Sequence, residues 1–298
     1  MKIPGRLIGQ TIEEKLKVEV SELTKRGRTP RLVDILIGES SEQLSFCSMK
    51  EKVAHRLGIE FNLVVIKSIP SFESLAKMLK DYARDPANTG IIIQQPLPTH
   101  LQTDSIYNFL PPIKEIEGHK AKSLFYPPIG LGILTALKFA YGNQEISTDL
   151  LIDINTDKDA LRKMLKHKKI VLIGRGPTGG ALIGKTLSML KINYLNINSK
   201  TDNPEQFYKN ADIIIAAVGR KVITPEIINP GVGLLTVGLR REGDRLRGDY
   251  DEDEIKDIAS YYSPTPGGVG PLDVLYLYKN LIESTRAQLD GIELTVKK

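Results

Sequence analysis

The chain has 298 residues, of which 41% are hydrophobic and 26% are charged, and its formal net charge is +5. This length suggests two domains, and because Lys and Arg alternate with Asp and Glu, the basic excess indicates a solvated surface and argues against a nucleic-acid partner. The single cysteine, Cys47, excludes an internal disulfide, and the absence of a signal-peptide or membrane-span pattern leads us to expect a cytoplasmic protein with no membrane partner.

The first third of the chain alternates between helical and extended patterns. The expected helices cover 12–25, 42–57 and 72–83, and the expected strands cover 32–37, 62–66 and 90–94. Strands that alternate with helices through short links imply a parallel sheet. Four prolines fall in residues 111–130, and we therefore expect the N-terminal domain to span 1–130.

A second alternating series follows a connecting helix at 131–141 and a polar segment at 142–169. The expected elements are a short helix at 157–167, strands at 170–173, 194–198, 212–216, 233–237 and 260–263, and a closing helix at 271–289. Parallel strands around a glycine-rich first turn describe a Rossmann-type domain. We expect this domain to span 131–270 and residues 271–298 to pack back on the N-terminal domain.

The most informative segment is the glycine-rich turn after the strand at 170–173. Gly174, Gly176 and Gly179 form G-x-G-x-x-G between an apolar run and a helical pattern. Glycines permit a tight turn and let backbone N–H groups approach a pyrophosphate, which the helix N-terminus stabilises. The sequence therefore predicts a dinucleotide site at this turn.

The residues around this turn favour NADP over NAD. An NAD site usually has a carboxylate about 20 residues beyond the glycines, whereas the next strand here is followed by Ser199 and Lys200. Arg175 lies inside the turn itself, and Arg, Ser and Lys suit a 2′-phosphate. NAD stays open, because Arg175 and Lys200 are also compatible with ordinary solvated charges.

Further motifs point to a second site and to a family. Gln94–Pro98 (QQPLP) follows a buried strand, 264–271 reads PTPGGVGP, and Lys50 lies on an amphipathic helix. Together with SKT at 199–201 and ADIIIAAVGR at 211–220, these motifs resemble the bifunctional methylenetetrahydrofolate dehydrogenase/cyclohydrolase family over nearly the whole chain.

The resemblance implies an α/β fold of two domains, an N-terminal catalytic domain and a Rossmann-type NAD(P)-binding domain, with the active site in the cleft between them. It also implies oxidation of 5,10-methylenetetrahydrofolate with NAD(P), hydrolysis of the methenyl product to 10-formyltetrahydrofolate, a role in one-carbon metabolism and purine biosynthesis, and a homodimer. Hydride transfer of this kind needs the two reacting rings held at near-attack distance, about 3–3.5 Å, more than it needs acid–base groups.

The implied site residues fall into three sets, and no metal-ligand spacing accompanies them. The implied catalytic residues are Lys50, Gln94 and Glu117. The implied substrate-binding residues are Phe46, Lys50, Ile93, Gln94, Gln95, Glu117, Pro266, Gly267, Gly268 and Val274. The implied cofactor-binding residues are Gly174, Arg175, Gly176, Gly179, Ser199, Lys200, Val218, Gly219, Gly238 and Leu239.

The chain departs from the family pattern at several of these positions. The motif Y-x-x-x-K reads Phe46 to Lys50, the aspartate of K-D-V-D-G is Glu117, P-C-T-P-x-G reads FYPPIG at 125–130, and the serine after glycine–arginine is Gly176. A buried lysine can act as a base in the hydrolysis, and Phe46 lacks the hydroxyl that would orient Lys50. We therefore expect dehydrogenase activity to survive better than cyclohydrolase activity.

Three alternatives stay open on the sequence alone. The chain could be a dehydrogenase without the second activity, a catalytically impaired homologue that binds folate or nucleotide, or a dehydrogenase for a substrate other than folate. Retention of Lys50, Gln94 and the glycine turn argues against the impaired homologue.

Overall fold

The computed structural model describes residues 1–296, which cluster into two compact units. The three-stranded unit comprises Glu13–Pro128 and Val274–Lys298, and the five-stranded unit comprises Met1–Ile12 and Ile129–Asp273. The first residues of the chain thus join the five-stranded unit, where the backbone N–H of Ile3 donates to the carbonyl of Tyr262 at 2.8 Å.

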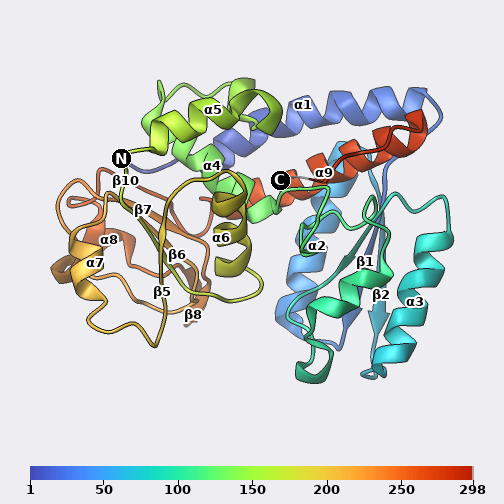
Figure 1. The fold of residues 1–298 in the computed structure, drawn as a ribbon, viewed down its shortest axis with the longest axis horizontal. Coiled ribbons are helices and arrows are strands. Elements are labelled where there is room, and N and C mark those ends of the chain that lie inside the picture. The colour runs from blue at the N-terminus through green and yellow to red at the C-terminus, as the bar shows by residue number, and fades with distance from the viewer. Residues whose placement is uncertain (297–298) are drawn as a thin grey trace. The chain divides into compact units, whose positions relative to one another are not determined.

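The three-stranded unit is built on a parallel sheet in the order β2-β1-β3. Its elements are most of α1 (Gly5–Lys25), β1 (Arg31–Ile37), α2 (Ser41–Leu57), β2 (Glu60–Ile66), α3 (Phe72–Arg84), β3 (Gly90–Ile93), the 3-10 helices η1 (Thr99–Leu101) and η2 (Asp104–Phe109), and most of α9 (Gly270–Asp290). Val33 and Ile35 of β1 pack with α3 and η2 on one face. Because side chains alternate along a strand, Asp34 points to the other face, where α2 lies (Figure 1).

Local signals in the sequence define both ends of α2. Its N-cap, Ser40, accepts a hydrogen bond from the backbone N–H of Gln43, and its C-cap, Gly58, adopts a left-handed conformation with φ 80°. The buried residues of α2 are Gln43, Cys47, Lys50, Val53, Ala54 and Leu57. The spacing of this row places Lys50 on the face of the helix that packs against the unit, not on the solvent face.

The five-stranded unit holds a parallel sheet in the order β10-β7-β6-β4-β5. Its elements are α4 (Pro128–Tyr141), η3 (Thr148–Leu150), α5 (Ile154–Leu165), β4 (Ile170–Ile173), α6 (Gly180–Met189), β5 (Leu195–Ile197), α7 (Glu205–Lys209), β6 (Ile213–Ala216), η4 (Pro225–Ile227), β7 (Gly233–Thr236), β8 (Arg240–Glu242), β9 (Arg245–Arg247), α8 (Glu252–Ile255) and β10 (Tyr261–Tyr262). Tyr208 of α7 and Ile255 of α8 pack against one face of the sheet, and α6 lies on the other (Figure 1).

The fold class expected from the sequence is confirmed, and each expected strand appears within two residues of its expected limits. Helix α1 begins seven residues earlier than expected, because Ile8 is fully buried and extends the apolar face toward the N-terminus. The antiparallel pair β8–β9 was not expected, since the segment RREGDRLR carries mostly charged residues. Among residues 1–296, none of the helices is both long enough and apolar enough to cross a lipid bilayer.

Candidate active site

Lys50 and Gln94 meet at the carboxyl end of β3. Lys50 Nζ donates to Gln94 Oε1 at 2.5 Å, across 44 positions of sequence. The backbone N–H of Gln94 bonds to the carbonyl of Ile35 at 2.9 Å, so the residue is held against β1. Its Nε2 donates to the carbonyl of Gln95 at 2.9 Å, which leaves Oε1 facing the lysine. A buried strand and a helix face therefore bring an amine and an amide acceptor into one polar site.

Asp34 is a third member of this cluster, and the sequence analysis missed it. Its Oδ2 lies 2.6 Å from Lys50 Nζ, and its side chain is 0% exposed. Apart from this ion pair, neither carboxylate oxygen accepts a hydrogen bond of ordinary geometry from residues 1–296. The available signal was a lone charge in the middle of the apolar strand RLVDILI.

Cys47 borders the same cluster. Its Sγ lies 3.8 Å from Gln94 Oε1, and the side chain is fully buried. Burial, followed by the negative charge of Asp34, raises the pKa of the Cys47 thiol to about 12. The thiol therefore stays protonated at neutral pH and is not a nucleophile here.

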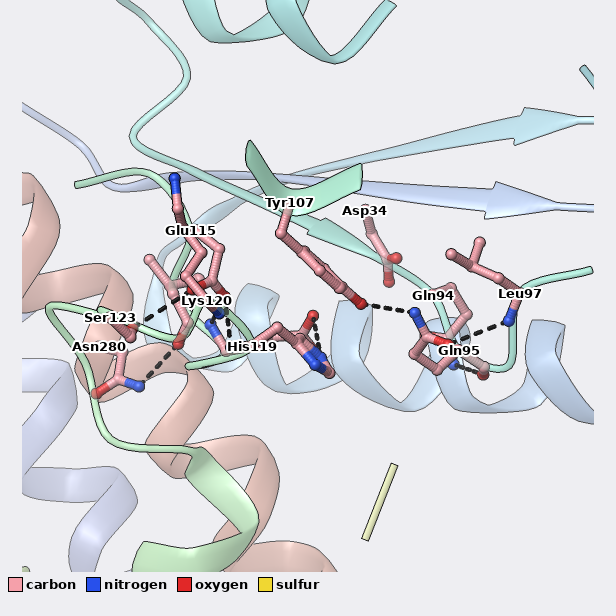
Figure 2. A network of polar contacts seen from close by, with 12 residues as sticks. Asp34, Gln94, Gln95, Leu97, Tyr107, Glu115, His119, Lys120, Ser123 and Asn280 are labelled. Atoms are coloured by element: carbon pink, nitrogen blue, oxygen red, sulfur yellow. Dashed lines mark hydrogen bonds and ion pairs between the residues drawn. The ribbon is translucent and has the colours of Figure 1, made fainter. Parts of the chain in front are cut away.

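The loop that carries Glu117 is organised by the preceding glutamate, Glu115, which is 2% exposed. The Glu115 carboxylate accepts backbone N–H bonds from Glu117 at 3.0 Å, His119 at 3.2 Å and Lys120 at 3.4 Å. Asn280 of α9 donates its Nδ2 hydrogen to the carbonyl of Ile116, the residue between the two glutamates, at 2.8 Å (Figure 2). These contacts fix the backbone and leave the Glu117 side chain 25% exposed.

An aromatic pair connects Glu117 to the segment after β3. Gln95 Nε2 donates to the hydroxyl of Tyr107 at 2.7 Å, and the Tyr107 ring stacks on His119 with centroids 4.4 Å apart (Figure 2). His119 Nε2 lies 3.7 Å from Glu117 Oε2, a distance that makes an ion pair when the imidazole is protonated. Burial raises the pKa of Tyr107 above its ordinary value, which keeps the phenol neutral. Neither aromatic residue was expected at the site, because Tyr107 lies outside the recognised motifs and the four histidines are scattered in the sequence.

The remaining implied substrate residues are apolar or belong to loops. Phe46 is partly buried and precedes Lys50 by four positions on α2, so both side chains lie on one helix face. Ile93 is fully buried at the end of β3, and Val274 of α9 is 6% exposed. Tyr278 of α9 donates its hydroxyl to the carbonyl of Lys50 at 2.7 Å, which anchors α2 at the lysine.

The glycine turn of the five-stranded unit contains two positions where backbone segments approach closely. A Cβ at Gly174, whose φ is +110°, would lie 2.7 Å from the carbonyl oxygen of Ala217, and a Cβ at Gly180 would lie 2.4 Å from that of Gly174. Gly179 is less tightly constrained, with Ala217 Cβ at 3.3 Å, and a Cβ at Gly176 would meet no atom of the described chain within 4 Å. Gly180 was missing from the expected set, and the turn opens into α6 as expected for a phosphate site.

Polar and basic side chains lie in this turn and directly after β5. Arg175, Ser199 and Lys200 are all exposed. Arg175 Nε donates to Asn196 Oδ1, and Asn196 Nδ2 donates to the carbonyl of Gly174 at 2.9 Å. Asn196 thus ties β5 to the glycine turn with a neutral amide, at a part of the fold where NAD enzymes usually place a carboxylate. The residues present fit a dinucleotide that carries an additional phosphate.

Asp249 holds together the two loops that contain the other implied cofactor residues, Val218–Gly219 and Gly238–Leu239. Its Oδ1 accepts from the backbone N–H of Gly219 at 2.7 Å, and its Oδ2 accepts from the N–H of Gly238 at 3.1 Å and from Thr236 Oγ1 at 2.7 Å. The side chain is fully buried. The carboxylate therefore positions both loops after β6 and β7.

The loop PTPGGVGP also belongs to the five-stranded unit. A Cβ at Gly5 would lie 1.9 Å from the carbonyl oxygen of Gly268, and Gly267, with φ +102°, lies against the Arg6 side chain. Part of the glycine requirement in this loop thus comes from packing against the start of α1. Pro266 is exposed beside these glycines.

Comparisons with known proteins identify two matching regions. Residues 158–289 match the tetrahydrofolate dehydrogenase/cyclohydrolase NAD(P)-binding domain, and residues 3–117 match the catalytic domain of the same family. The bifunctional protein FolD of Bacillus subtilis is 31% identical, with 96% of this chain and 98% of that protein covered.

Solved structures show the same fold at lower sequence identity. The FolD methylenetetrahydrofolate dehydrogenase/cyclohydrolase of Campylobacter jejuni has a TM-score of 0.83 at 24% identity, with 96% of this chain and 98% of that chain covered. The Trypanosoma brucei methylenetetrahydrofolate dehydrogenase-cyclohydrolase, complexed with NADP and an inhibitor, has a TM-score of 0.75 at 24% identity, with 96% and 97% covered.

Proposed function

The chain belongs to the tetrahydrofolate dehydrogenase/cyclohydrolase family, and we propose that it oxidises 5,10-methylenetetrahydrofolate with NADP and hydrolyses the methenyl product to 10-formyltetrahydrofolate. The observation that carries this proposal is the 2.5 Å contact between Lys50 Nζ and Gln94 Oε1. It places an amine with a fixed acceptor at the carboxyl end of a parallel sheet, where open α/β folds bind ligands.

The hydrolytic step requires a proton acceptor and a means of holding the pterin. Water adds to the methenyl carbon, the carbon–nitrogen bond to one ring nitrogen breaks, and one proton is released for each 10-formyl product. Lys50 is the group that accepts or relays this proton, and Gln94 orients it. Glu117, with its backbone fixed by Glu115, presents a carboxylate that can accept two hydrogen bonds from the amino-pyrimidine edge of a pterin.

The five-stranded unit supplies the cofactor site. Backbone segments approach so closely at Gly174 and Gly180 that neither position has room for a side chain, and the turn leads into the N-terminus of α6, which suits a pyrophosphate. Arg175, Ser199 and Lys200 suit a 2′-phosphate. Bound NADP would supply the hydride acceptor for the oxidation. The buried carboxylate of Asp249 would hold the loops at Gly219 and Gly238 in the geometry that receives it.

Finer features of the function are part of the same proposal. Hydride transfer requires the pterin and nicotinamide rings to be held at near-attack distance. We extend the proposal to a cytoplasmic homodimer that supplies formyl groups for purine biosynthesis. The exposed Arg175 and Lys200 support NADP as the cofactor, with NAD as the alternative.

A spectrophotometric assay with both cofactors tests the proposal. Reduced nicotinamide and methenyltetrahydrofolate are followed together, so that oxidation and hydrolysis are separated. We expect both activities in the native chain, and we expect Lys50→Met to abolish hydrolysis while Lys52→Met, an exposed lysine on the same helix, leaves it intact. Oxidation without hydrolysis would instead support the dehydrogenase-only alternative that Phe46 suggests. The absence of both activities would refute the proposal.

A further inference from the structure

Asp34 lies in the centre of an apolar sheet, where a carboxylate is unusual. On β1 it pairs in register with Leu63 of β2 and Ile92 of β3, so apolar residues flank it on both sides. The side chain is 0% exposed and is directed away from the sheet toward the side on which Gln94 lies (Figure 2). A buried charge of this kind is strongly unfavourable unless a partner compensates it, and the partner here is Lys50 at 2.6 Å.

The two contacts of Lys50 determine how its ammonium is oriented. An ammonium has three N–H donors. One donates to Gln94 Oε1 at 2.5 Å, and the nitrogen lies 2.6 Å from Asp34 Oδ2 in an ion pair. The two contacts together hold the nitrogen at one position beside the sheet. With Gln94 alone, the nitrogen would be held at a single point, and the flexible lysine side chain could pivot about that point.

The second anchor comes from the sheet and not from α2. Phe46 lies four positions before Lys50 on the same helix face, where the family motif has a tyrosine, and its ring offers no hydroxyl to the lysine. We propose that Asp34 is a positioning residue for Lys50. Asp34 replaces the hydroxyl that is missing at Phe46 and preserves the lysine orientation that the hydrolytic step needs. This inference rests on the proposed function, because it concerns the hydrolysis that Lys50 serves.

The groups around Asp34 are consistent with an anchor that acts on the lysine specifically. Cys47 of α2 is a weak, protonated donor, and Tyr278 of α9 donates its hydroxyl to the Lys50 carbonyl instead. Lys50 is therefore the cation that faces this carboxylate. Its side chain is 10% exposed, so it keeps a path to substrate.

Three variants test the positioning role through activity. We expect Asp34→Asn to lower kcat for hydrolysis about 100-fold, a loss that a displacement of about 1 Å can cause, and to leave oxidation and the folate KM within about threefold. We expect Phe46→Tyr in the Asp34→Asn background to recover at least about tenfold of the hydrolysis. Asp81→Asn makes the same chemical change at an exposed position of α3 and serves as the control.

A second measurement does not depend on turnover. Acetylation of Lys50 by a small amine-reactive ester is followed by peptide mass spectrometry, with exposed Lys52 as the internal reference. We expect Asp34→Asn to raise the relative rate at Lys50 at least about threefold, because the amine is released from its ion pair. If labelling responds in a chain that lacks both activities, the proposed function fails while the anchoring of Lys50 stands.

Two results would overturn the inference. The first is unchanged hydrolysis together with unchanged Lys50 labelling in Asp34→Asn. The second is an equal loss of oxidation and hydrolysis that Phe46→Tyr does not recover, which would give Asp34 a purely structural role.

Discussion

The Asp34–Lys50 pair makes a quantitative prediction about stability that requires no substrate. In Lys50→Met the Asp34 carboxylate stays 0% exposed and loses the cation at 2.6 Å. Breaking a buried pair in this way costs about 3–5 kcal/mol, because an uncompensated charge remains in an apolar environment. Asp34→Leu leaves the ammonium its bond to Gln94 and partial access to solvent, so we expect a smaller loss of about 1–3 kcal/mol.

The double variant distinguishes this argument from simple loss of packing. With Asp34→Leu and Lys50→Met combined, both charges are gone and apolar side chains of similar shape fill the space, so the net change should be within about 1 kcal/mol of the native chain. The coupling energy between the two positions should therefore be at least about 3 kcal/mol, which far exceeds what independent sites show.

Urea titration with peptide-resolved hydrogen exchange over Arg31–Ile37 is the appropriate assay. The two units need not unfold together, so a local probe on β1 is preferable to a global midpoint. Lys52→Met and Asp81→Asn are matched surface controls, and each should change stability by less than about 0.5 kcal/mol. Additive effects of the two buried substitutions would refute the reasoning, because they would mean that the two charges do not compensate each other.

Four further predictions concern single residues. Phe46→Tyr in the native background should raise hydrolysis no more than about threefold, because Asp34 already anchors Lys50, and should leave oxidation within about twofold. A gain as large as in the Asp34→Asn background would show that Asp34 does not replace the missing hydroxyl. Gly176→Ser should lower the KM for NADP about fivefold relative to NAD, since the added side chain meets no described atom and gains about 1 kcal/mol from one phosphate bond; equal effects on both cofactors would contradict this. Asp249→Asn should raise the KM for NADP about 10-fold to 100-fold and the KM for folate less, because the charge-assisted bonds to two loops are weakened. An unchanged KM for NADP would show that those loops do not depend on the charge. Burial raises the pKa of Cys47 to about 12, so Cys47 in the folded chain should react with iodoacetamide at pH 8.5 at least tenfold more slowly than in urea. The free energy of unfolding that the neutral thiol contributes should be fully present below about pH 9 and should fall between pH 9 and 12.

Much of the fold was accessible from the sequence because local pattern and tertiary packing agree. Strand β4 is an apolar run that ends at a glycine turn, and it appears at its expected limits, Ile170–Ile173. The pair β8–β9 was missed for the opposite reason: its strands are charged and largely exposed, and the turn at Gly243 carries the information that the strands lack. Periodicity identifies buried faces, and an exposed hairpin has none.

The candidate site was only partly accessible for a related reason. Motifs identify residues that occur at fixed spacing, such as Lys50 and Gln94, whereas a contact between distant segments leaves no local pattern. Asp34 interrupts an apolar strand, which signals a buried charge and not its partner. Gly180 directly follows the glycine motif, and the sequence does not show why this position must be glycine. The reason is tertiary: the backbone of Gly174 approaches Gly180 too closely for a side chain to fit.

Phe46 and Asp34 have complementary consequences for the same amine. A hydroxyl at position 46 would belong to α2 and would move with Lys50, so it would orient the ammonium relative to the helix alone. Asp34 belongs to the central strand of its sheet and therefore ties the ammonium to a strand that is hydrogen-bonded along both edges. Gln94, bonded to the Ile35 carbonyl, is fixed to the same strand. Both anchors of Lys50 thus belong to the sheet, and a substitution that shifts α2 should disturb hydrolysis less than one that removes either anchor.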